Sequence, residues 1–600
     1  MKHNSQLKVP LNMDRDNITP SYLRVLRAAV QISRVVRPRK ENAVATKKTN
    51  KEVTMNSYKN RIRTYRTAGI VLALFVTIIS AQAQTFTTLV NFDGTNGNGP
   101  NAPLVEGMCG DLYGTTWQGG ANSQGTIFRV TLAGTFSVLY NFCALANCAD
   151  GSVPLGALLQ ANGDLYGTAF TGGASNFGDV FKINPTTLTL TVLESFDYTD
   201  GEDPRGGLAI GRNGSFYGVT TAGGSDYNDG TIFTVTLDGT IAPLVTFNES
   251  GGYPLNAAVT LVLGNDGNFY GTTGASGSPY YSGTIFKVTP AGTYTVLHTF
   301  NGTTDGAEPQ SGLLLGTDGN FYGTTPYEGA NNNGVVFKIT PAGTYTVLYA
   351  FDGTNGSAPY AALTLGSDGN FYGTTSAGGA NGNGTIFKIT PKGTVTDLYD
   401  FTSADGQSTV AGVTQATNGI FYGATYDGGT SGDGTVFSLN TGLPPFVSLA
   451  VTSAREGAAV GILGQGFSSS SVVEFGGVPA TTVEPPGTTY LSATVPFGAL
   501  TGPVTVTTGS TTLTSNRTFR VTPTLTSFTP LSGPVGTSVT INGTGLTQAT
   551  YVKFNGESAV FSVQSDSEIT ATVPSDATTG KITVTTAGGT AVSTASFTVD

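Results

Sequence analysis

The chain has 600 residues with 29 Lys and Arg and 39 Asp and Glu, and the first 66 residues hold 16 of the basic side chains but only 4 of the acidic ones. The rest of the chain therefore carries 13 basic and 35 acidic side chains, a net charge of −22. So acidic a region repels phosphate groups, which excludes nucleic acid and anionic membrane surfaces as partners. Glycine accounts for 83 of the 600 residues, and 11% of the residues are charged. Ordinary domains contain about 7% glycine and ~25% charged residues, so this composition is typical of turn-rich extracellular β proteins.

Residues 55–83 have the pattern of a secretory signal. A cationic stretch from Lys59 to Arg66 precedes an apolar run from Ala68 to Ala81, and Ala81-Gln82-Ala83 forms a small-x-small cleavage site. The apolar run of 14 residues is shorter than the ~20 that a membrane-spanning helix needs. We therefore expect cleavage after Ala83 and no membrane span in the mature chain.

Residues 1–54 lie before this signal, although signal sequences normally begin at the initiator. They are either an unusual basic leader or the product of a start codon assigned too far upstream, and we favour the second interpretation. A nucleic-acid-binding arm is disfavoured, because it would stay on the other side of the membrane from the domains. Export predicts a secreted, periplasmic or cell-surface location.

Three cysteines allow one disulfide at most. Cys143 and Cys148 enclose an insertion, FCALANC, in a loop that has no cysteine in other copies of the repeat described below. Export permits disulfides, so a local Cys143–Cys148 bond is plausible, with Cys109 left as a lone thiol that we expect to be buried. The spacing of the three fits no metal-binding pattern.

A phrase seen most clearly as DGNFYGTT recurs seven times. Its tyrosine stands at positions 113, 166, 217, 270, 322, 372 and 422, spaced by 50 to 53 residues. A repeat of this length cannot bury its own apolar faces and must stack on copies of itself.

Turn signals divide each copy into four strands, here named A to D. In the copy from Ala361 to Phe401, strands A (363–365) and B (371–375) flank Asp368-Gly369, a dipeptide suited to a tight hairpin. A Gly- and Asn-rich loop leads to strand C (385–389), and Pro391-Lys392-Gly393 forms the turn to strand D (395–401).

Adjacent aromatic side chains in strand B predict sheets that are covered on both faces. Phe371 and Tyr372 must point to opposite faces, and strand C repeats the pattern with Ile386 and Phe387. Sheets covered on both sides by copies of themselves are blades of a propeller or rungs of a solenoid.

The chain ends of the repeat region decide between these two. Residues 85–94, TFTTLVNFDG, match a strand D, whereas the last copy stops after its strand C at residues 436–439. A closed ring uses this offset, because the N-terminal strand completes the last blade and leaves no exposed edge. We predict an all-β chain whose residues 84–442 form a seven-bladed β-propeller, with Thr85 to Phe92 beside residues 435–439.

The combination YGTT…GG…GTIFK at fixed offsets resembles the GloVer repeat proteins, tandem-repeat proteins of the Gloeobacter/Verrucomicrobia type. The resemblance covers roughly residues 85–440. It implies an exported bacterial protein with a β-propeller fold, and it implies no established activity.

After Leu443 a period of 79 residues replaces the aromatic phrase: Gly464-Gln465-Gly466 corresponds to Gly543-Thr544-Gly545. Strands alternate, with Ile582 and Val584 expected inside, as in an immunoglobulin-like β-sandwich. We predict two sandwiches, 443–522 and 523–600. The second, with TPLSGPVGTSVTINGTGL from Thr529, resembles an IPT/TIG domain; the first is similar but has TSAREGAAV in place of the leading Pro-x-Ser-Gly-Pro pattern.

No residue is assigned a catalytic role. His298 occupies a strand D position that holds tyrosine in other copies, so it is interpreted as a substituted packing residue, and no partner that would orient it as a base is recognisable. The seven repeated tyrosines are interpreted as core and not as a sugar-stacking surface, because blade packing alone explains them.

Carboxylates remain the candidates for chemistry. In a blade, the B–C and D–A loops lie on one rim, and this loop face is the expected working surface. Its acidic residues are Asp93, Asp197, Asp200, Glu202, Asp203, Asp305, Glu308, Asp352, Asp226, Asp229, Asp427 and Asp433. Asp197, Asp200 and Asp203 form the densest cluster and could bind calcium, but they lack a complete calcium-loop pattern and solvated turns are the favoured interpretation.

These observations favour an exported, monomeric, non-catalytic scaffold or binding protein that recognises an extracellular glycan or protein through the loop face. The alternative is a polysaccharide lyase or glycosidase with accessory sandwich domains, for which two carboxylates roughly 5–10 Å apart in a central pocket would be the sign. A purely structural adhesive or matrix component is a third possibility. No cofactor other than calcium is suggested.

Overall fold

A computed structural model describes residues 84–224, 229–247, 260–274, 282–481, 483–484 and 487–600. The leader, the signal sequence with its cleavage after Ala83, and Asp226 lie outside these residues. The described chain is built of β-strands, and its one helical segment is a short 3-10 turn, η1 (Ala146–Cys148). No helix in these described ranges has the length and apolar composition of a membrane span.

Residues 85–440 form seven antiparallel sheets, which we call the repeat sheets, each with the strands of one copy. In chain order, the first four are β2 (Val105–Glu106), β3 (Leu112–Thr116), β4 (Thr126–Val130), β5 (Phe136–Asn141); β6 (Leu159–Ala161), β7 (Asp164–Ala169), β8 (Asp179–Asn184), β9 (Thr189–Ser195); β10 (Glu202–Pro204), β11 (Ala209–Ile210), β12 (Phe216–Ala222), β13 (Thr231–Val235), β14 (Ile241–Thr246); and β15 (Val262–Leu263), β16 (Phe269–Thr273), β17 (Thr284–Val288), β18 (Tyr294–Thr299). The others are β19 (Leu314–Leu315), β20 (Phe321–Thr325), β21 (Val335–Ile339), β22 (Tyr345–Ala350); β23 (Thr364–Leu365), β24 (Phe371–Thr375), β25 (Thr385–Ile389), β26 (Val395–Asp400); and β27 (Thr414–Gln415), β28 (Phe421–Thr425), β29 (Thr435–Asn440) with β1 (Thr85–Asn91).

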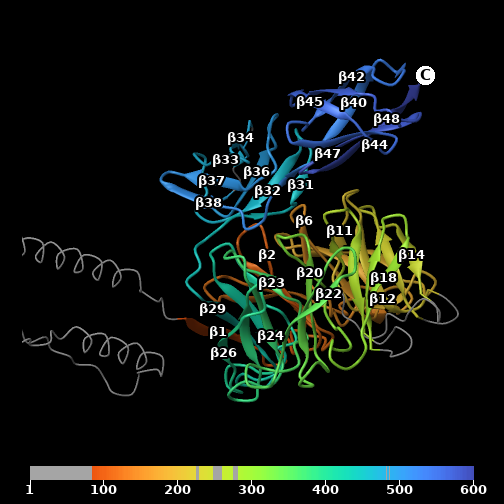
Figure 1. Cartoon of the computed structure of the whole chain (residues 1–600). Helices are drawn as coiled ribbons and strands as arrows, with labels where there is room; N and C mark the ends of the chain where they lie inside the picture. Colours follow the sequence, from red (N-terminus) through yellow and green to blue (C-terminus); the bar gives the residue numbers. More distant parts are fainter. Residues whose placement is uncertain (1–83, 225–228, 248–259, 275–281, 482, 485–486) are drawn as a thin grey trace, which may run out of the picture. The chain divides into compact units, whose positions relative to one another are not determined.

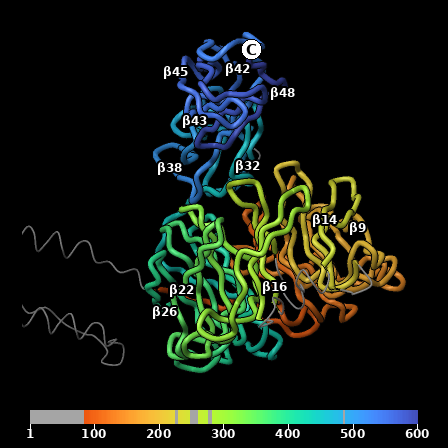
Figure 2. Tube along the Cα trace, turned by 45° about the vertical axis from the view of Figure 1, so that its right-hand side comes forward, coloured from red at the N-terminus to blue at the C-terminus, as the bar shows by residue number. Residues whose placement is uncertain are grey.

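The four-strand interpretation of the repeat is confirmed. In the copy used above, β24 and β25 have the predicted bounds, while β23 begins one residue later and β26 ends one residue earlier than expected. All five residues of β24 are buried, as are four of the five in β25, so both faces of the sheet are covered. The colours in Figure 2 run from orange through yellow and green to teal across neighbouring sheets, so copies that follow in the sequence are neighbours in space.

The N-terminal strand pairs where its resemblance to a strand D predicts. β1 runs antiparallel to β29, with Thr85 opposite Asn440 and Asn91 opposite Thr435, and Figure 1 shows the two strands side by side. At the opposite edge of the same sheet, in β27, the Thr414 hydroxyl donates a hydrogen bond to the Leu104 carbonyl at 2.6 Å. The last copy of the repeat thus contacts both the first strand and the first complete copy.

The repeated tyrosines form the contact between neighbouring sheets. Tyr270 stacks on Phe321 of the next sheet with ring centroids 4.0 Å apart, and Tyr372 does the same with Phe421. All seven tyrosines are at most 4% exposed. The Tyr270 hydroxyl donates to the Asp266 carboxylate at 2.8 Å, so the Asp of the DGNFYG turn satisfies the polar end of a buried ring. The interpretation of these tyrosines as core is confirmed.

Two further groups of sheets follow residue 443. The first contains β30 (Ser448–Leu449), β32 (Ala459–Leu463), β36 (Tyr490–Thr494) and β35 (Val483–Glu484); β34 (Val478–Pro479), β33 (Val472–Phe475), β37 (Val504–Thr508) and β38 (Thr511–Thr514); and the pair β31 (Ser453–Ala454) and β39 (Arg520–Val521). The second contains β40 (Thr524–Thr529), β42 (Ser538–Thr544), β46 (Glu568–Thr572) and β45 (Val560–Ser565); and β41 (Ser532–Gly533), β48 (Gly589–Val599), β47 (Gly580–Thr586), β43 (Ala549–Phe554) and β44 (Glu557–Ser558).

Each group has its own apolar core between two sheets, as the alternating strands predict. In β47, Ile582 and Val584 are fully buried, whereas Thr583 and Thr585 between them keep exposed surface. One-sided burial of this kind is the sandwich arrangement.

Candidate functional site

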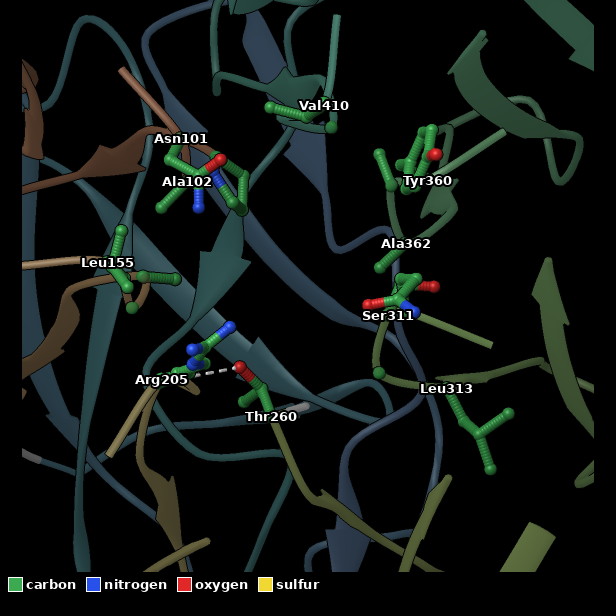
Figure 3. A pocket seen from close by; sticks show the side chains of 18 of the residues that line it. Asn101, Ala102, Leu155, Arg205, Thr260, Ser311, Leu313, Tyr360, Ala362 and Val410 are labelled. Atoms are coloured by element: carbon green, nitrogen blue, oxygen red, sulfur yellow. Dashed lines mark hydrogen bonds between the residues drawn. The ribbon is translucent and has the colours of Figure 1, made fainter. Parts of the chain in front are cut away.

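The innermost segments of the repeat sheets surround a cavity of about 720 Å³. Each segment leads into a strand A and contributes a small residue or proline to the wall (Figure 3). These are Pro103, Ala157, Gly207, Thr260, Gly312, Ala362 and Gly412, which stand at equivalent positions in the seven copies. Because all seven copies contribute, we call this cavity the channel.

Close approach of neighbouring segments explains the small residues. A Cβ atom on Gly312 would lie 2.5 Å from the Thr260 carbonyl oxygen, and one on Gly207 would lie 2.8 Å from that of Ala157. Buried threonines of strand B also bind four of these segments: Thr324, for example, donates to the carbonyl of the next sheet's innermost segment at 2.9 Å, and Thr168, Thr272 and Thr374 do the same. The channel wall is therefore rigid and consists largely of backbone.

One position at the entrance of the channel differs from copy to copy. It follows the proline of the D–A loop, where a fixed φ orients the chain, in five of the six described copies and Thr409 in the last, and we call it the mouth position. A Cβ on Gly178 would lie 2.7 Å from the Cδ of Pro204, which shows how closely this proline packs on the neighbouring sheet. The mouth position holds Asn101, Leu155, Arg205, Gln310, Tyr360 and Val410, six different side chains that all line the channel.

Aromatic side chains from the start of the B–C loops line the same end. Trp117 and Tyr426 stack with ring centroids 6.0 Å apart, and the Arg205 guanidinium carbon lies 4.8 Å from the centre of the Phe170 ring. Trp117 is the only tryptophan of the chain. All these aromatic rings belong to residues that keep some exposed surface, unlike the tyrosines between sheets.

Tyr360 extends the aromatic group on the far side of the mouth. Its hydroxyl is hydrogen-bonded to that of Tyr327. Burial and this hydrogen bond raise the pKa of Tyr360, so the hydroxyl stays neutral and can donate or accept at all ordinary pH values. A flat ring with a neutral hydroxyl is suited to stacking and hydrogen bonding with a polyol.

The opposite end of the channel is lined by the first sandwich domain. Arg517, which precedes β39, borders both the channel and a second cavity of about 280 Å³. Two hydrogen bonds join this domain to the A–B turns of the repeat sheets: Thr489 Oγ1 donates to the Met108 carbonyl at 3.0 Å, and Gln465 Nε2 donates to Thr417 Oγ1 at 2.8 Å. Surrounding protein lowers the pKa of Arg517 by desolvation.

The described lining of the channel contains two arginines, Arg205 and Arg517, and no Asp or Glu. The pair of carboxylates expected for a glycosidase is thus not found among the described residues that line it. What the arrangement offers instead is aromatic rings, amides, hydroxyls and two guanidinium groups around one cavity.

The predicted acidic candidates behave as turn residues. The Asp197 carboxylate accepts hydrogen bonds from the Thr199 backbone at 3.0 Å and hydroxyl at 2.6 Å, and Asp93 and Asp352 repeat this arrangement with Thr95 and Thr354. These hydrogen bonds lower the pKa of Asp197. The favoured interpretation of these acidic residues, that they stabilise solvated turns, accounts for these hydrogen bonds.

Asp197, Asp200 and Asp203 are the three carboxylates suggested for calcium. Asp200 Oδ1 accepts from the Asp197 backbone at 3.0 Å, and burial raises the pKa of Asp203, an effect that the charge of Arg205 partly opposes. Among the described residues no group of three His, Cys, Asp or Glu side chains could hold a metal ion. The charge of Asp197 contributes to the raised pKa of Asp200, after the larger effect of burial, and calcium binding by these carboxylates stays a prediction.

Cys143 and Cys148 are joined by a disulfide with their Cα atoms 4.0 Å apart, and the Cys109 thiol is exposed and unpaired. The sequence-based suggestion of a buried Cys109 is wrong.

His298 has a partner that the sequence did not reveal. Its Nε2 lies 3.1 Å from Asp305 Oδ2, and its ring stacks on Tyr345 with centroids 4.0 Å apart. Tyr140 and Tyr399 make the same contact with Asp150 and Asp405 in other sheets. Desolvation lowers the pKa of His298. His298 thus replaces a tyrosine that anchors the D–A loop, and it does not line the channel.

Comparison with sequence families gives two matches. The Gloeobacter/Verrucomicrobia repeat matches residues 75–265 and 257–461, and the IPT/TIG domain matches residues 523–599. No curated protein matches the chain.

Several solved structures show a distant likeness. A chain of a nidogen/laminin complex is 16% identical, with a TM-score of 0.29, over 44% of this chain and 86% of that one. TolB from Acinetobacter baumannii is 13% identical, with a TM-score of 0.29, over 45% and 58%. A surface glycan-binding protein from Prevotella bryantii is 18% identical, with a TM-score of 0.20, over 24% and 38%. This chain thus spans less than two thirds of the last two, and likenesses so weak carry no argument about function.

Proposed function

Because the chain belongs to the Gloeobacter/Verrucomicrobia repeat family, whose copies here surround one cavity, we propose that it is an exported, non-catalytic binding protein that recognises a glycan in the channel. The observation that carries this proposal is the mouth position. This position holds six different side chains in the six described copies, among them two amides, an arginine and a tyrosine.

The chemistry at the mouth favours a sugar. Trp117, Phe170, Tyr360 and Tyr426 present aromatic surface, and Asn101 and Gln310 present amides that can donate and accept hydrogen bonds. The volume of about 720 Å³ lies in the range of ligand sites. A protein partner would instead need a broad apolar surface with a polar rim.

The proposal includes a closed ring of seven blades, residues 84–442, in which β1 completes the last blade. The β1–β29 pairing and the Thr414–Leu104 hydrogen bond support it. It further includes removal of residues 55–83 as a signal, sandwich domains at 443–522 and 523–600 that hold the ring away from a surface, a monomeric state, and a secreted, periplasmic or cell-surface location.

A glycan array probed with the secreted protein tests the proposal, with calcium and with a chelator. We expect a defined set of glycans to bind equally in both conditions, and Tyr360→Ala to weaken their binding. A matched variant, Tyr551→Ala, removes an exposed tyrosine of the second sandwich domain and should leave binding unchanged. If no glycan on the array bound the protein in either condition, the proposal would be contradicted.

The enzymatic alternative makes a different prediction for the same protein. A lyase or glycosidase would release shorter products from a bound polysaccharide within hours, which chromatography of the mixture detects. We expect the polysaccharide to remain intact.

A further inference from the structure

We propose that the glycan held in the channel is anionic, and that Arg205 at the mouth and Arg517 at the opposite end bind its acidic groups. This inference rests on the proposed function and specifies its ligand. It concerns a sugar chain bearing oxyanions, whether carboxylates of uronic acids or sulfate esters.

The first argument is the charge of the channel compared with the rest of the molecule. Beyond residue 66 the chain has 13 basic and 35 acidic residues, yet the described channel lining has two arginines and no carboxylate. Five of the 13 basic residues, Arg129, Lys182, Lys287, Lys338 and Lys388, stand at one repeated position of strand C, where they belong to the repeat itself. Arg205 does not, because the equivalent position in other copies is uncharged.

The second argument is that neither guanidinium has an ionic partner. No ion pair of Arg205 or Arg517 occurs in the described part of the chain. The Nε of Arg205 is buried without a hydrogen-bond partner there, and its guanidinium lies against the Phe170 ring. Buried charges in proteins are normally paired. The Asp203 carboxylate interacts with Arg205 electrostatically but forms no ion pair with it, so the guanidinium at the cavity can still bind an anion from outside.

The third argument is the placement of the two arginines at different depths. Arg205 follows a D–A loop, whereas Arg517 borders the second cavity together with Leu314, Leu365 and Gln415, which lie next to the A–B turns at the other end of strand A. Because the two arginines border different ends of the channel, we infer an oligosaccharide with more than one acidic unit. Figure 3 shows the Arg205 side chain directed into the cavity whose far wall carries Tyr360 and Ser311.

The chemistry of the guanidinium group fits this assignment. Arginine binds carboxylate and sulfate oxygens through two parallel N–H donors, which fixes the orientation of the anion. The desolvated surroundings of Arg517 strengthen such a bond, because electrostatic attraction grows as water is excluded. Aromatic rings at the mouth then contact the apolar faces of the adjoining sugar units.

Isothermal titration calorimetry of the secreted protein with defined oligosaccharides tests the inference. The probes are oligogalacturonate, a sulfated galactan oligosaccharide and neutral oligosaccharides of the same length, with oligo-aspartate as an anionic peptide. We expect binding of at least one acidic oligosaccharide and weaker or no binding of its neutral counterpart. Raising the salt concentration from about 50 to about 500 mM should weaken binding of the acidic oligosaccharide, since part of the electrostatic attraction is screened.

Single substitutions then test whether Arg205 and Arg517 bind the acidic groups of the ligand. Arg205→Gln and Arg517→Gln should each lower the affinity for the acidic oligosaccharide by about tenfold or more, because a bidentate ionic hydrogen bond is lost. Arg205→Lys should retain only part of the wild-type affinity. Arg455→Gln makes the same charge change at an exposed residue that does not line the channel and should have no effect. Thermal unfolding of each variant confirms that the fold is retained.

The outcomes separate the two proposals. If neutral oligosaccharides bind as well as acidic ones and the arginine variants behave as wild type, this inference is overturned while glycan recognition stands. If oligo-aspartate binds as tightly as the sugars and depends on both arginines, the ligand is an acidic peptide and the glycan assignment is wrong. If no probe binds, both are contradicted. Comparing the uronate and sulfate arms identifies the oxyanion.

Discussion

Two positions of the repeat differ in how much the residue varies from copy to copy. The strand B tyrosine is identical in all seven copies and lies between neighbouring sheets, at most 4% exposed. The mouth position differs in each of the six copies described and faces a cavity. A side chain enclosed by copies of itself has one shape that fits, whereas a side chain at a cavity is free to vary. The comparison separates residues that pack neighbouring repeat sheets together from residues that distinguish one copy from another.

Removal of the first strand should have the largest effect. A chain that begins at residue 93 lacks β1 and exposes the edge of β29, which pairs with it. Because an unpaired edge promotes association between molecules, we expect aggregation or loss of cooperative unfolding, measured by light scattering and calorimetry against a chain beginning at residue 84. An unchanged, monomeric protein would show that the ring does not depend on this strand.

Two tyrosines in neighbouring copies test the comparison directly. Tyr322→Ala removes a ring that packs on Phe371 and a hydroxyl bound to Asp318, and should lower the free energy of unfolding by about 3–5 kcal/mol. Tyr360→Ala removes a partly exposed ring at the mouth and should cost about 1 kcal/mol or less. Denaturant unfolding measures both. Equal losses would show that the two positions are not distinct in kind.

A buried acid between the first complete copy and the last copy of the repeat should make stability depend on pH. Burial raises the pKa of Glu106 to about 7 from 4.5, despite hydrogen bonds from the Thr417 N–H at 2.8 Å and hydroxyl at 2.6 Å. The folded state therefore favours the protonated acid, and its contribution is fully present below pH 4.5 and lost as pH rises through about 7. The loss amounts to about 2–3 kcal/mol.

Glu106→Gln supplies the control. The variant keeps the shape of the side chain and cannot ionise, so the difference in unfolding free energy between wild type and variant should shift in the variant's favour from pH 4.5 to 8. A difference that stays constant over this range would contradict the assignment of the titration to Glu106.

The smallest expected effect concerns His298. His298→Tyr introduces the residue that makes the corresponding contact elsewhere, as Tyr399 does with Asp405 at 2.6 Å. The free energy of unfolding should change by less than about 1 kcal/mol, and ligand binding should not change. Loss of binding in this variant, with the fold intact, would show that the His298–Asp305 pair takes part in recognition.

Most of the repeat region could be predicted from the sequence because the residues that pack its sheets together recur at the same position in each copy. Phe371, Tyr372 and the Asp368-Gly369 turn determine β24 and its neighbours, and the strand D resemblance of residues 85–94 predicts the pairing of β1. Where each copy presents the same side chains to the next, local pattern and global fold agree.

The channel could not be predicted in the same way. Sequence reasoning searched for acidic clusters, whereas the described lining of the channel contains no Asp or Glu. The one available signal was variation: the position after the D–A proline, or after Thr409 in the last copy, holds six different side chains in the six described copies, and Arg205 and Tyr360 belong to it. Arg517 left no such signal, because it comes from another domain and only the folded chain brings it to the channel.

The most direct test of channel recognition uses the fluorescence of Trp117, which is the only tryptophan of the chain and lies at the mouth. Titration with an acidic oligosaccharide should shift or quench its emission in a saturable way, with the dissociation constant found by calorimetry, and Arg205→Gln should move both curves together. Calorimetric binding that leaves the emission of Trp117 unchanged would place the ligand elsewhere and contradict the account.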